Sequence, residues 1–125
     1  RRGGSRSFLF RIMANTFVNK KADLTSTSAT TLYTVPSATT AVIKSILVSE
    51  DSGNADTITV TITDTDDAVF SLFKTKSISA NATTELLSAP LVAQESEIIK
   101  VTAATANRLH VVLSALEIKP RTVTS

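Results

Sequence analysis

The segment "TITVTITD", residues 57–64, constrains the fold of this chain more than any other part of the sequence. Its aliphatic residues Ile58, Val60 and Ile62 alternate with threonines. A period of two residues places successive side chains on opposite faces of an extended chain, so one face is aliphatic and the other carries hydroxyl groups. The pattern predicts a half-buried β-strand whose aliphatic face packs on a core.

Similar extended segments recur along the chain, and no stretch has the periodicity of a helix. We expect about eight strands, over residues 16–24, 31–35, 41–49, 57–63, 68–78, 83–92, 96–103 and 108–118. Proline cannot donate a hydrogen bond to a β-ladder. We therefore expect Pro36 to end the second strand, Pro90 to interrupt the sixth and Pro120 to end the last.

These strands predict an all-β fold, an antiparallel two-sheet β-sandwich with an extended N-terminal arm. A jelly-roll-like arrangement is the first prediction, and periodicity leaves immunoglobulin-like and up-and-down arrangements open. The segment 41–49 contains the continuous apolar run Ile46, Leu47 and Val48. Such a run predicts a central strand that is buried on both faces.

Composition is consistent with one folded domain that has an aliphatic core. Apolar residues make up 42% of the 125 residues and charged residues 19%, which is typical of a globular chain. Aromatic residues make up only 5%, without tryptophan, so a platform that stacks on bases or sugars is poorly supplied. The absence of cysteine excludes disulfides, thiolate metal sites and thiol catalysis, and is compatible with assembly in a reducing cytoplasm. No apolar run is as long as a membrane-spanning helix.

Charge and periodicity predict three parts: a basic and apolar arm (residues 1–15), a sandwich domain (residues 16–119) and a C-terminal tail (residues 120–125). The net charge of +2 consists of +4 in residues 1–12, +1 at Arg121 and −3 in the rest of the chain. An acidic body with a basic arm differs from the basic surface of a nucleic-acid binder. We therefore expect no direct nucleic-acid partner, and an arm of one subunit that lies on the body of another.

The arm supplies the first set of candidate contact residues. Its apolar side chains would be buried against a neighbouring subunit, while its arginines would bind carboxylates with their planar guanidinium groups. The alternative is a disordered or adventitious leader that has no partner. The candidates are Arg1, Arg2, Arg6, Phe8, Leu9, Phe10, Arg11 and Ile12.

Two acidic loops, "EDSGNAD" (residues 50–56) and "DTDD" (residues 64–67), supply the second set of candidates for partner contacts. The alternative is that these residues serve turn geometry and solubility. A calcium site is not expected, because the EF-hand pattern that Asp64 and Asp66 begin lacks its glycine and its final glutamate. The candidates are Glu50, Asp51, Asp56, Asp64, Asp66 and Asp67.

No enzyme motif is present. His110 is the only histidine, and no nucleophile or carboxylate lies at a spacing typical of a catalytic partner. We expect it on a strand, on the face opposite Leu109 and Val111. The chain is therefore predicted to be non-enzymatic, without catalytic residues, metal, cofactor or small-molecule substrate. Lysines on the expected strands protect sheet edges in this interpretation; they are Lys44, Lys74, Lys76 and Lys100.

Two longer stretches, "TTLYTVPSATTAVIKSILVSE" (residues 30–50) and "ELLSAPLVAQESEIIKVTAATANRLHVVLSALEI" (residues 85–118), are similar to small structural proteins of tailed bacteriophages, notably marine and cyanobacterial phages. Together they cover a little under half of the chain, whereas residues 1–12 have no counterpart. The resemblance implies a component of the virion, most often a β-sandwich that decorates or cements a capsid or belongs to the tail. It implies no catalytic residues.

The resulting expectation is a phage capsid decoration (cement) protein on the capsid surface of the virion, assembled in the host cytoplasm. Its partners would be the major capsid protein and further copies of itself, as a homotrimer at three-fold positions, with no membrane partner. One alternative is a tail or neck accessory or adaptor protein. Another is a carbohydrate-binding sandwich, which would need exposed aromatics from Tyr33 and the five phenylalanines.

Overall fold

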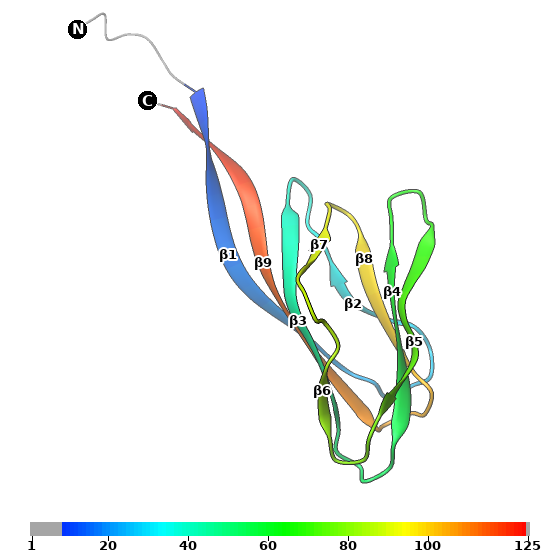
Figure 1. The fold of residues 1–125 in the computed structure, drawn as a ribbon. Helices are drawn as coiled ribbons and strands as arrows, with labels where there is room; N and C mark the ends of the chain where they lie inside the picture. Colours follow the sequence, from blue (N-terminus) through cyan, green and yellow to red (C-terminus); the bar gives the residue numbers. More distant parts are fainter. Residues whose placement is uncertain (1–8, 125) are drawn as a thin grey trace, which may run out of the picture.

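The structure is a computed structural model that describes residues 9–124, with the side chains of residues 14–120. This part of the chain is all-β and forms two antiparallel sheets that pack face to face (Figure 1). It contains no helix long and apolar enough to cross a membrane. The strands are β1 (Leu9–Asp23), β2 (Thr30–Thr34), β3 (Thr40–Glu50), β4 (Asp56–Thr63), β5 (Val69–Ile78), β6 (Thr83–Glu85), β7 (Leu91–Ala93), β8 (Ile98–Ala103) and β9 (Leu109–Thr124).

The two sheets combine strands from both ends of the chain. Sheet I has the order β1-β9-β3-β6, with β7 also paired to β3, and sheet II has the order β2-β8-β4-β5. The pairs are nested, since β1 pairs with β9, β2 with β8, β3 with β6 and β7, and β4 with β5. Successive nested pairs fall in alternate sheets, as when one long hairpin is rolled into a jelly roll. The predicted antiparallel, jelly-roll-like sandwich is confirmed.

The strands β6 and β7 share one position at the edge of sheet I. β6 pairs with residues 47–49 of β3, and β7 pairs with residues 41–43 of the same strand. Pro90 lies in the interruption between them, as predicted. Counted as one interrupted strand, they reduce the nine strands of the described chain to the eight positions of a jelly roll.

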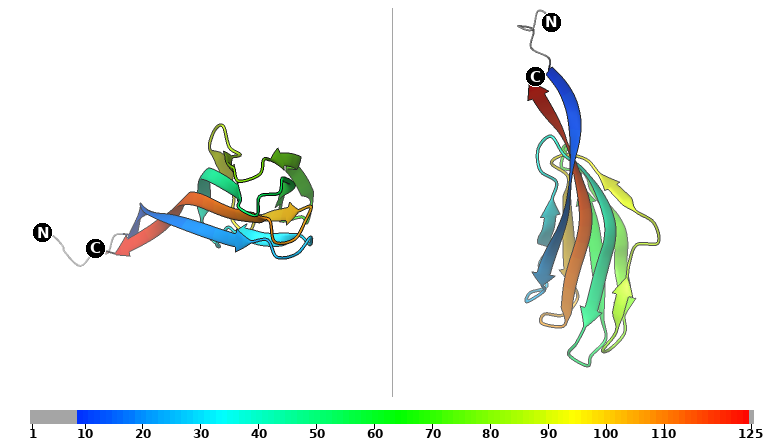
Figure 2. Two further views of the ribbon diagram at one scale, coloured as in Figure 1. Left: turned by 90° about the horizontal axis from the view of Figure 1, so that it is seen from below. Right: turned by 90° about the vertical axis from the view of Figure 1, so that its left-hand side faces the viewer.

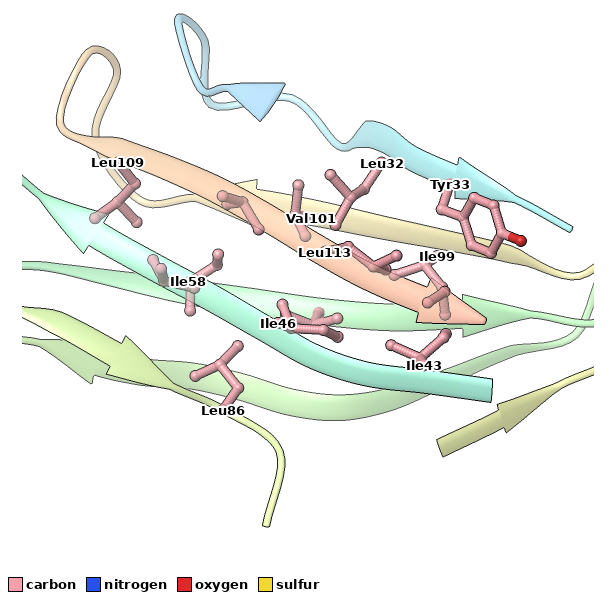
Figure 3. Close-up of a cluster of buried hydrophobic side chains, with 14 of the residues drawn as sticks. Leu32, Tyr33, Ile43, Ile46, Ile58, Leu86, Ile99, Val101, Leu109 and Leu113 are labelled. Carbon is pink, nitrogen blue, oxygen red and sulfur yellow. The ribbon is translucent and has the colours of Figure 1, made fainter. Parts of the chain in front are cut away.

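The core lies between the inner faces of the two sheets. Ile43, Ile46 and Leu113 of sheet I are fully buried, and so are Ile99 and Val101 of sheet II. Figure 3 shows these side chains gathered in the space between β3, β9 and β8. Tyr33 is the only aromatic residue in the buried set, so the prediction of an aliphatic core is confirmed for the described residues.

The alternation of Ile58, Val60 and Ile62 with threonines corresponds to β4. Ile58 and Val60 are fully buried, whereas Thr57, Thr59 and Thr61 lie partly exposed on the other face of sheet II. The prediction of one aliphatic face and one hydroxyl face is confirmed for residues 57–61, whereas at the end of the strand Ile62 is only partly buried and Thr63 is buried.

The prediction that residues 41–49 are buried on both faces is wrong. β3 is central in sheet I, and Ile46 and Val48 are buried, but Leu47 between them is 38% exposed. The face of sheet I that points away from sheet II, called the outer face below, is not covered by any element of the described chain. Its apolar residues therefore remain partly exposed to solvent.

The expected limits of the first and last strands are also wrong. β1 begins at Leu9 rather than near residue 16, and β9 continues through Pro120 to Thr124. The two strands pair without a register shift from Leu9 opposite Thr124 to Asp23 opposite His110. The expected boundaries of the arm and the tail therefore fall inside paired strands.

Pro120 does not end β9 because its missing N–H lies on an unpaired edge. Leu24 N donates to Leu109 O at 3.0 Å, so Leu109 directs its backbone polar groups toward β1. By alternation, the odd-numbered residues of β9 face β1 and the even-numbered residues face the other edge. Pairing with β3 on that other edge ends at Ile118, opposite Thr40. Proline is tolerated where its nitrogen faces such an open edge.

The far ends of β1 and β9 form a two-stranded ribbon, residues 9–14 paired with residues 119–124. Figures 1 and 2 show this ribbon extending well beyond the two packed sheets. Its outermost pair is Leu9 with Thr124. The sandwich therefore has two different ends, a ribbon end and a distal end.

Candidate interaction surfaces

The two acidic loops lie at opposite ends of the sandwich. Residues 50–56 connect β3 to β4 at the distal end, together with the β1–β2, β5–β6 and β8–β9 connections. Residues 64–67 connect β4 to β5 at the ribbon end, together with the β2–β3 and β7–β8 connections (Figure 1). The two acidic loops that were predicted as contact sites therefore do not form one surface.

Glu50 is buried and holds the distal loops in place. Its Oε1 atom accepts hydrogen bonds from the backbone N–H groups of Gly53 at 3.0 Å and Asn81 at 3.1 Å. Its Oε2 atom accepts from Ser52, both from the backbone N–H at 2.8 Å and from the hydroxyl group. The side chain is 2% exposed, so it ties the β3–β4 loop to the β5–β6 turn instead of facing a partner.

We expect Glu50→Gln to destabilise the fold at neutral pH, because the amide NH₂ of glutamine would face backbone donors. Burial raises the pKa of Glu50, but the bonds from Ser52, Asn81 and Gly53 outweigh it and lower the pKa from 4.5 to about 2. A lowered pKa gives stability that is present above the ordinary pKa and is lost as pH falls through the folded-state pKa. The difference in melting temperature between wild type and Glu50→Gln should therefore be constant above pH 4.5 and should shrink toward pH 2.

The matched control is Asp67→Asn, since Asp67 is an exposed acid at a backbone φ of 64° that asparagine also tolerates. Its melting temperature should follow the wild type at every pH. A Glu50→Gln difference that does not change with pH would refute the assignment of the stabilisation to the ionised carboxylate.

Asp56 and Arg108 connect the β8–β9 loop to the end of the β3–β4 loop. Asp56 Oδ2 accepts a hydrogen bond from Thr105 N at 3.0 Å, and Arg108 Nη1 donates to Ala55 O at 2.9 Å. Asp56 is 8% exposed. Its carboxylate thus joins the β8–β9 loop to the start of β4 and offers little surface to a partner.

His110 lies between two carboxylates on the outer face of sheet I. Its Nε2 atom is 3.2 Å from Asp23 Oδ1, and its Nδ1 atom is 3.5 Å from Asp51 Oδ2. Leu109 and Val111 are buried, so the prediction that His110 faces away from them is confirmed. The sequence did not reveal the two carboxylates, because only the pairing of β1, β9 and β3 brings them beside the ring.

Ser49 completes a row of residue types that resembles a catalytic triad. It is the cross-strand neighbour of His110 on β3, and Asp23 is the neighbour on β1. In a triad one ring nitrogen accepts the proton of the serine hydroxyl. Here each nitrogen of His110 faces a carboxylate oxygen, and no hydrogen bond joins it to Ser49 within the described chain. The row is an exposed polar contact between strands.

Asp64 shapes the turn at the ribbon end. Its Oδ1 atom accepts hydrogen bonds from Asp66 N and Ala68 N, both at 2.9 Å. This is an Asx-type turn, in which the side chain replaces a backbone acceptor. Asp66 and Asp67 remain exposed. Among the described residues no group of three or more His, Cys, Asp or Glu side chains is arranged to hold a metal ion.

A groove of about 780 Å³ opens at the base of the ribbon. Ile118 and Pro120 of β9 form one side, and Thr65 and Glu95 from two loops form another. Glu95 Oε2 accepts a hydrogen bond from Ala38 N at 2.6 Å, so this carboxylate holds the β2–β3 loop. The groove is shallow and open, and its lining presents no cluster of charged groups.

An apolar row crosses the whole outer face of sheet I. Phe17 of β1 pairs with Leu116 of β9, Leu116 with Val42 of β3, and Val42 with Val92 of β7. Directly paired residues point to the same face of a sheet, so the four side chains lie side by side. Phe17 is 76% exposed and Val92 is 52% exposed. The row is not visible in the sequence because it depends on the register of four strands.

The arm candidates have different positions relative to the described chain. Leu9, Phe10, Arg11 and Ile12 belong to β1 and pair with residues 121–124 of β9, but their side chains lie outside the described residues. Arg1, Arg2, Arg6 and Phe8 lie entirely outside the described residues. Contacts of these eight residues with a partner remain a prediction.

Comparisons with known proteins relate the fold to a phage capsid. No protein-family model matches the sequence, and no curated protein matches it. The structure is similar to a chain in the acidic stable capsid structure of Helicobacter pylori bacteriophage KHP30, with a TM-score of 0.53 and 14% identity. The match covers 94% of this chain and 98% of that chain, so the two share a fold over nearly their whole lengths.

Two further solved structures align more weakly. A chain of the cyanophage Pam1 capsid asymmetric unit has a TM-score of 0.37 and 16% identity, covering 87% of this chain and 84% of that chain. A chain of the infectious bursal disease virus Gx strain structure has a TM-score of 0.41 and 11% identity, covering 96% of this chain and 36% of that chain. Both scores are too low to establish a common fold.

Proposed function

We propose that this protein is a non-enzymatic structural protein of a phage virion that decorates and cements the capsid. It binds the major capsid protein and further copies of itself at the capsid surface, after assembly in the host cytoplasm. The observation that carries the proposal is the fold, an eight-position jelly roll that matches 98% of a chain in a phage capsid structure. The similarity of residues 30–50 and 85–118 to phage structural proteins agrees with it.

The outer face of sheet I is the surface that we assign to the major capsid protein. Of the five large apolar side chains that are exposed in the described chain, Phe17, Leu47 and Val92 lie on this face. Exposed apolar side chains that gather on one face mark an interaction surface. The exposed carboxylate of Asp51, beside His110 on this face, would contribute to its polar rim.

The fold is suited to a cementing role because its loops and sheets are tied together. Glu50 joins two loops at the distal end, and the hydrogen bond from Tyr33 to Glu117 joins the two sheets. A cement protein must transmit load between capsid subunits without unfolding. The carbohydrate-binding alternative is not proposed, since Tyr33 is buried and the exposed Phe17 and Phe70 lie on different sheets, where they form no common platform for a sugar.

The experiment mixes the purified protein with capsids that lack it, and measures cosedimentation and the temperature at which the capsids open. We expect saturable binding and a higher opening temperature. Val92→Glu should weaken binding by about tenfold or more, because it buries a charge in the contact. The matched control is Val69→Glu, since Val69 is an equally accessible valine, 61% exposed, on β5 of sheet II.

No binding and no change in opening temperature would contradict the capsid proposal. If Val92→Glu and Val69→Glu weaken capsid binding equally, the assignment of the outer face of sheet I as the capsid-binding surface is contradicted.

Densitometry of purified virions gives the copy number of this protein per particle. A number close to that of the major capsid protein agrees with a capsid position, and a few copies per particle would place the protein in the tail or neck.

A further inference from the structure

The edge strands of the sandwich differ in how they avoid pairing with other chains. Exposed strand edges are protected in monomeric proteins by short length, bulges, lysines or proline. β2 has five residues and a register shift, and β6 and β7 have three residues each on either side of Pro90. β5 has two register shifts and carries Lys74 and Lys76. These three edges are protected.

The outer edge of β1 has none of these protections between Leu9 and Asn19. The strand is 15 residues long, contains no proline and pairs with β9 without a bulge. Arg11 is the only charged residue in this stretch, since Lys20, Lys21 and Asp23 all lie at its C-terminal end. No strand of the described chain pairs with this edge, so its outward N–H and C=O groups are free to accept a strand.

Phe17 is an independent sign of a missing neighbour. It lies on the outer face of β1 beside Leu116 of β9, and it remains 76% exposed. A phenylalanine in the middle of a sheet has a cross-strand neighbour on both sides. Phe17 has one on the β9 side only, and a strand added to the β1 edge would supply the second.

The two-stranded ribbon would also be stabilised by a strand added to the β1 edge. Residues 9–14 and 119–124 form six pairs beyond the last pair of β9 with β3. A two-stranded ribbon without further support is marginally stable in water, whereas three or more strands with an apolar face are stable. The open edge of β9 is a poor acceptor, because Pro120 offers no N–H there. The added strand is therefore expected on β1.

We propose that β1 pairs antiparallel with β1 of a second copy of this chain, which joins sheet I of the two copies into one continuous sheet. The inference rests on the self-association in the proposed function, and it assigns the surface and the symmetry. An antiparallel contact of one edge with itself is isologous and closes after two copies, so both open edges are used and no fibre grows. The other three edges are protected, so a three-fold ring, which needs two different edges, is disfavoured. The expected homotrimer is replaced here by a two-fold dimer.

Charge favours the antiparallel orientation. If residues 9–19 of the two copies overlap, Lys20 and Lys21 of one copy lie at the opposite end of the contact from those of the other copy. A parallel pairing would place the lysines side by side, where like charges destabilise a sheet. The two-fold axis is perpendicular to the joined sheet, so both outer faces lie on the same side and present two apolar rows to one capsid surface.

The test is Asn15→Pro, with Asn15→Ala as the matched control. In the β1–β9 ladder the even-numbered residues of β1 face β9, because they pair with the odd-numbered residues of β9. Asn15 therefore directs its N–H to the free edge, and proline removes it without breaking the ladder. We expect a dimer for wild type and Asn15→Ala by analytical ultracentrifugation, and a dissociation constant about 100-fold higher for Asn15→Pro.

Phe17→Ser is a second variant that leaves the backbone donors intact, and it should raise the dissociation constant of the dimer about fivefold or more.

Hydrogen exchange of the unmodified full chain is a measurement that needs no variant. Amides of the odd-numbered residues 11–19 should exchange slowly in concentrated protein and fast after dilution. Fast exchange at all concentrations, a monomeric wild type, or a trimer that Asn15→Pro does not affect would overturn the inference.

The capsid experiment separates this inference from the proposed function. A monomer that still cosediments with capsids would refute the β1 contact and leave the capsid function standing. A dimer that Asn15→Pro dissociates, but that does not bind capsids, would support the β1 contact and refute the function.

Discussion

Replacing Leu113 by alanine is expected to lower the free energy of unfolding by about 2–5 kcal/mol. Leu113 is fully buried on β9, among Ile46, Ile99 and Val101 at the centre of the core (Figure 3). Truncation removes buried apolar surface and leaves a cavity that strands from two sheets cannot easily close. Urea denaturation followed by circular dichroism measures the loss.

Leu47→Ala is the matched control, because Leu47 is also a leucine in the middle of sheet I but points to the outer face. It is 38% exposed, so we expect a loss of less than about 1 kcal/mol. Equal losses for Leu113→Ala and Leu47→Ala would mean that the outer face is covered in the isolated protein, and would contradict the description of β3 as a strand with one buried face.

Replacing Tyr33 by phenylalanine is expected to lower the free energy of unfolding by about 1.5–3 kcal/mol. The Tyr33 hydroxyl donates to Glu117 Oε2 at 2.6 Å, and this bond links β2 of sheet II to β9 of sheet I. The two residues are 2% and 6% exposed, so the mutation leaves a buried carboxylate without its donor. Lys119 Nζ is 3.7 Å from the other carboxylate oxygen and compensates only in part.

The pH dependence identifies the hydroxyl as the cause. Burial, then the hydrogen bond to Glu117 and the charge of that carboxylate, raise the pKa of Tyr33 well above its ordinary value of 10.0. A raised pKa gives stability that is fully present below the unfolded-state pKa and is lost as pH rises toward the folded-state value. The stability difference between wild type and Tyr33→Phe should be constant up to about pH 10 and should shrink above it.

Glu117→Gln keeps an acceptor for the Tyr33 hydroxyl, so it should lower the free energy of unfolding less than Tyr33→Phe does. The reverse order would contradict the role of this hydrogen bond.

Fold class was predictable because it depends on local patterns. The alternation of Ile58 and Val60 with threonines reports directly which face of β4 is buried, and Pro90 reports the break between β6 and β7. Strand limits were less predictable. Whether Pro120 ends a strand depends on the edge to which its nitrogen points, and that is a property of the pairing of β9 with β1 and β3.

The candidate site residues were predicted by type more than by role. Acidic residues in loops were predicted to contact a partner, but Glu50, Asp56 and Asp64 accept hydrogen bonds from backbone N–H groups of the protein's own loops. The reverse holds for the outer face of sheet I, since Phe17 and Val92 are ordinary strand residues in the sequence. They become a candidate surface only when the register of four strands places them in one row.

Side-chain alternation and proline act over neighbouring residues, so the order of residues along the chain was enough to predict an all-β sandwich of about eight strand positions with an aliphatic core. The three-dimensional pairing of strands was needed to show which strands lie at the edges, which apolar face remains uncovered and which carboxylates are buried. Those properties depend on pairs such as Leu9 with Thr124 and Tyr33 with Glu117, which are far apart in the chain. The free edge of β1 and the apolar row beside it belong to this second group, since a strand becomes an edge only through the absence of a partner on one side.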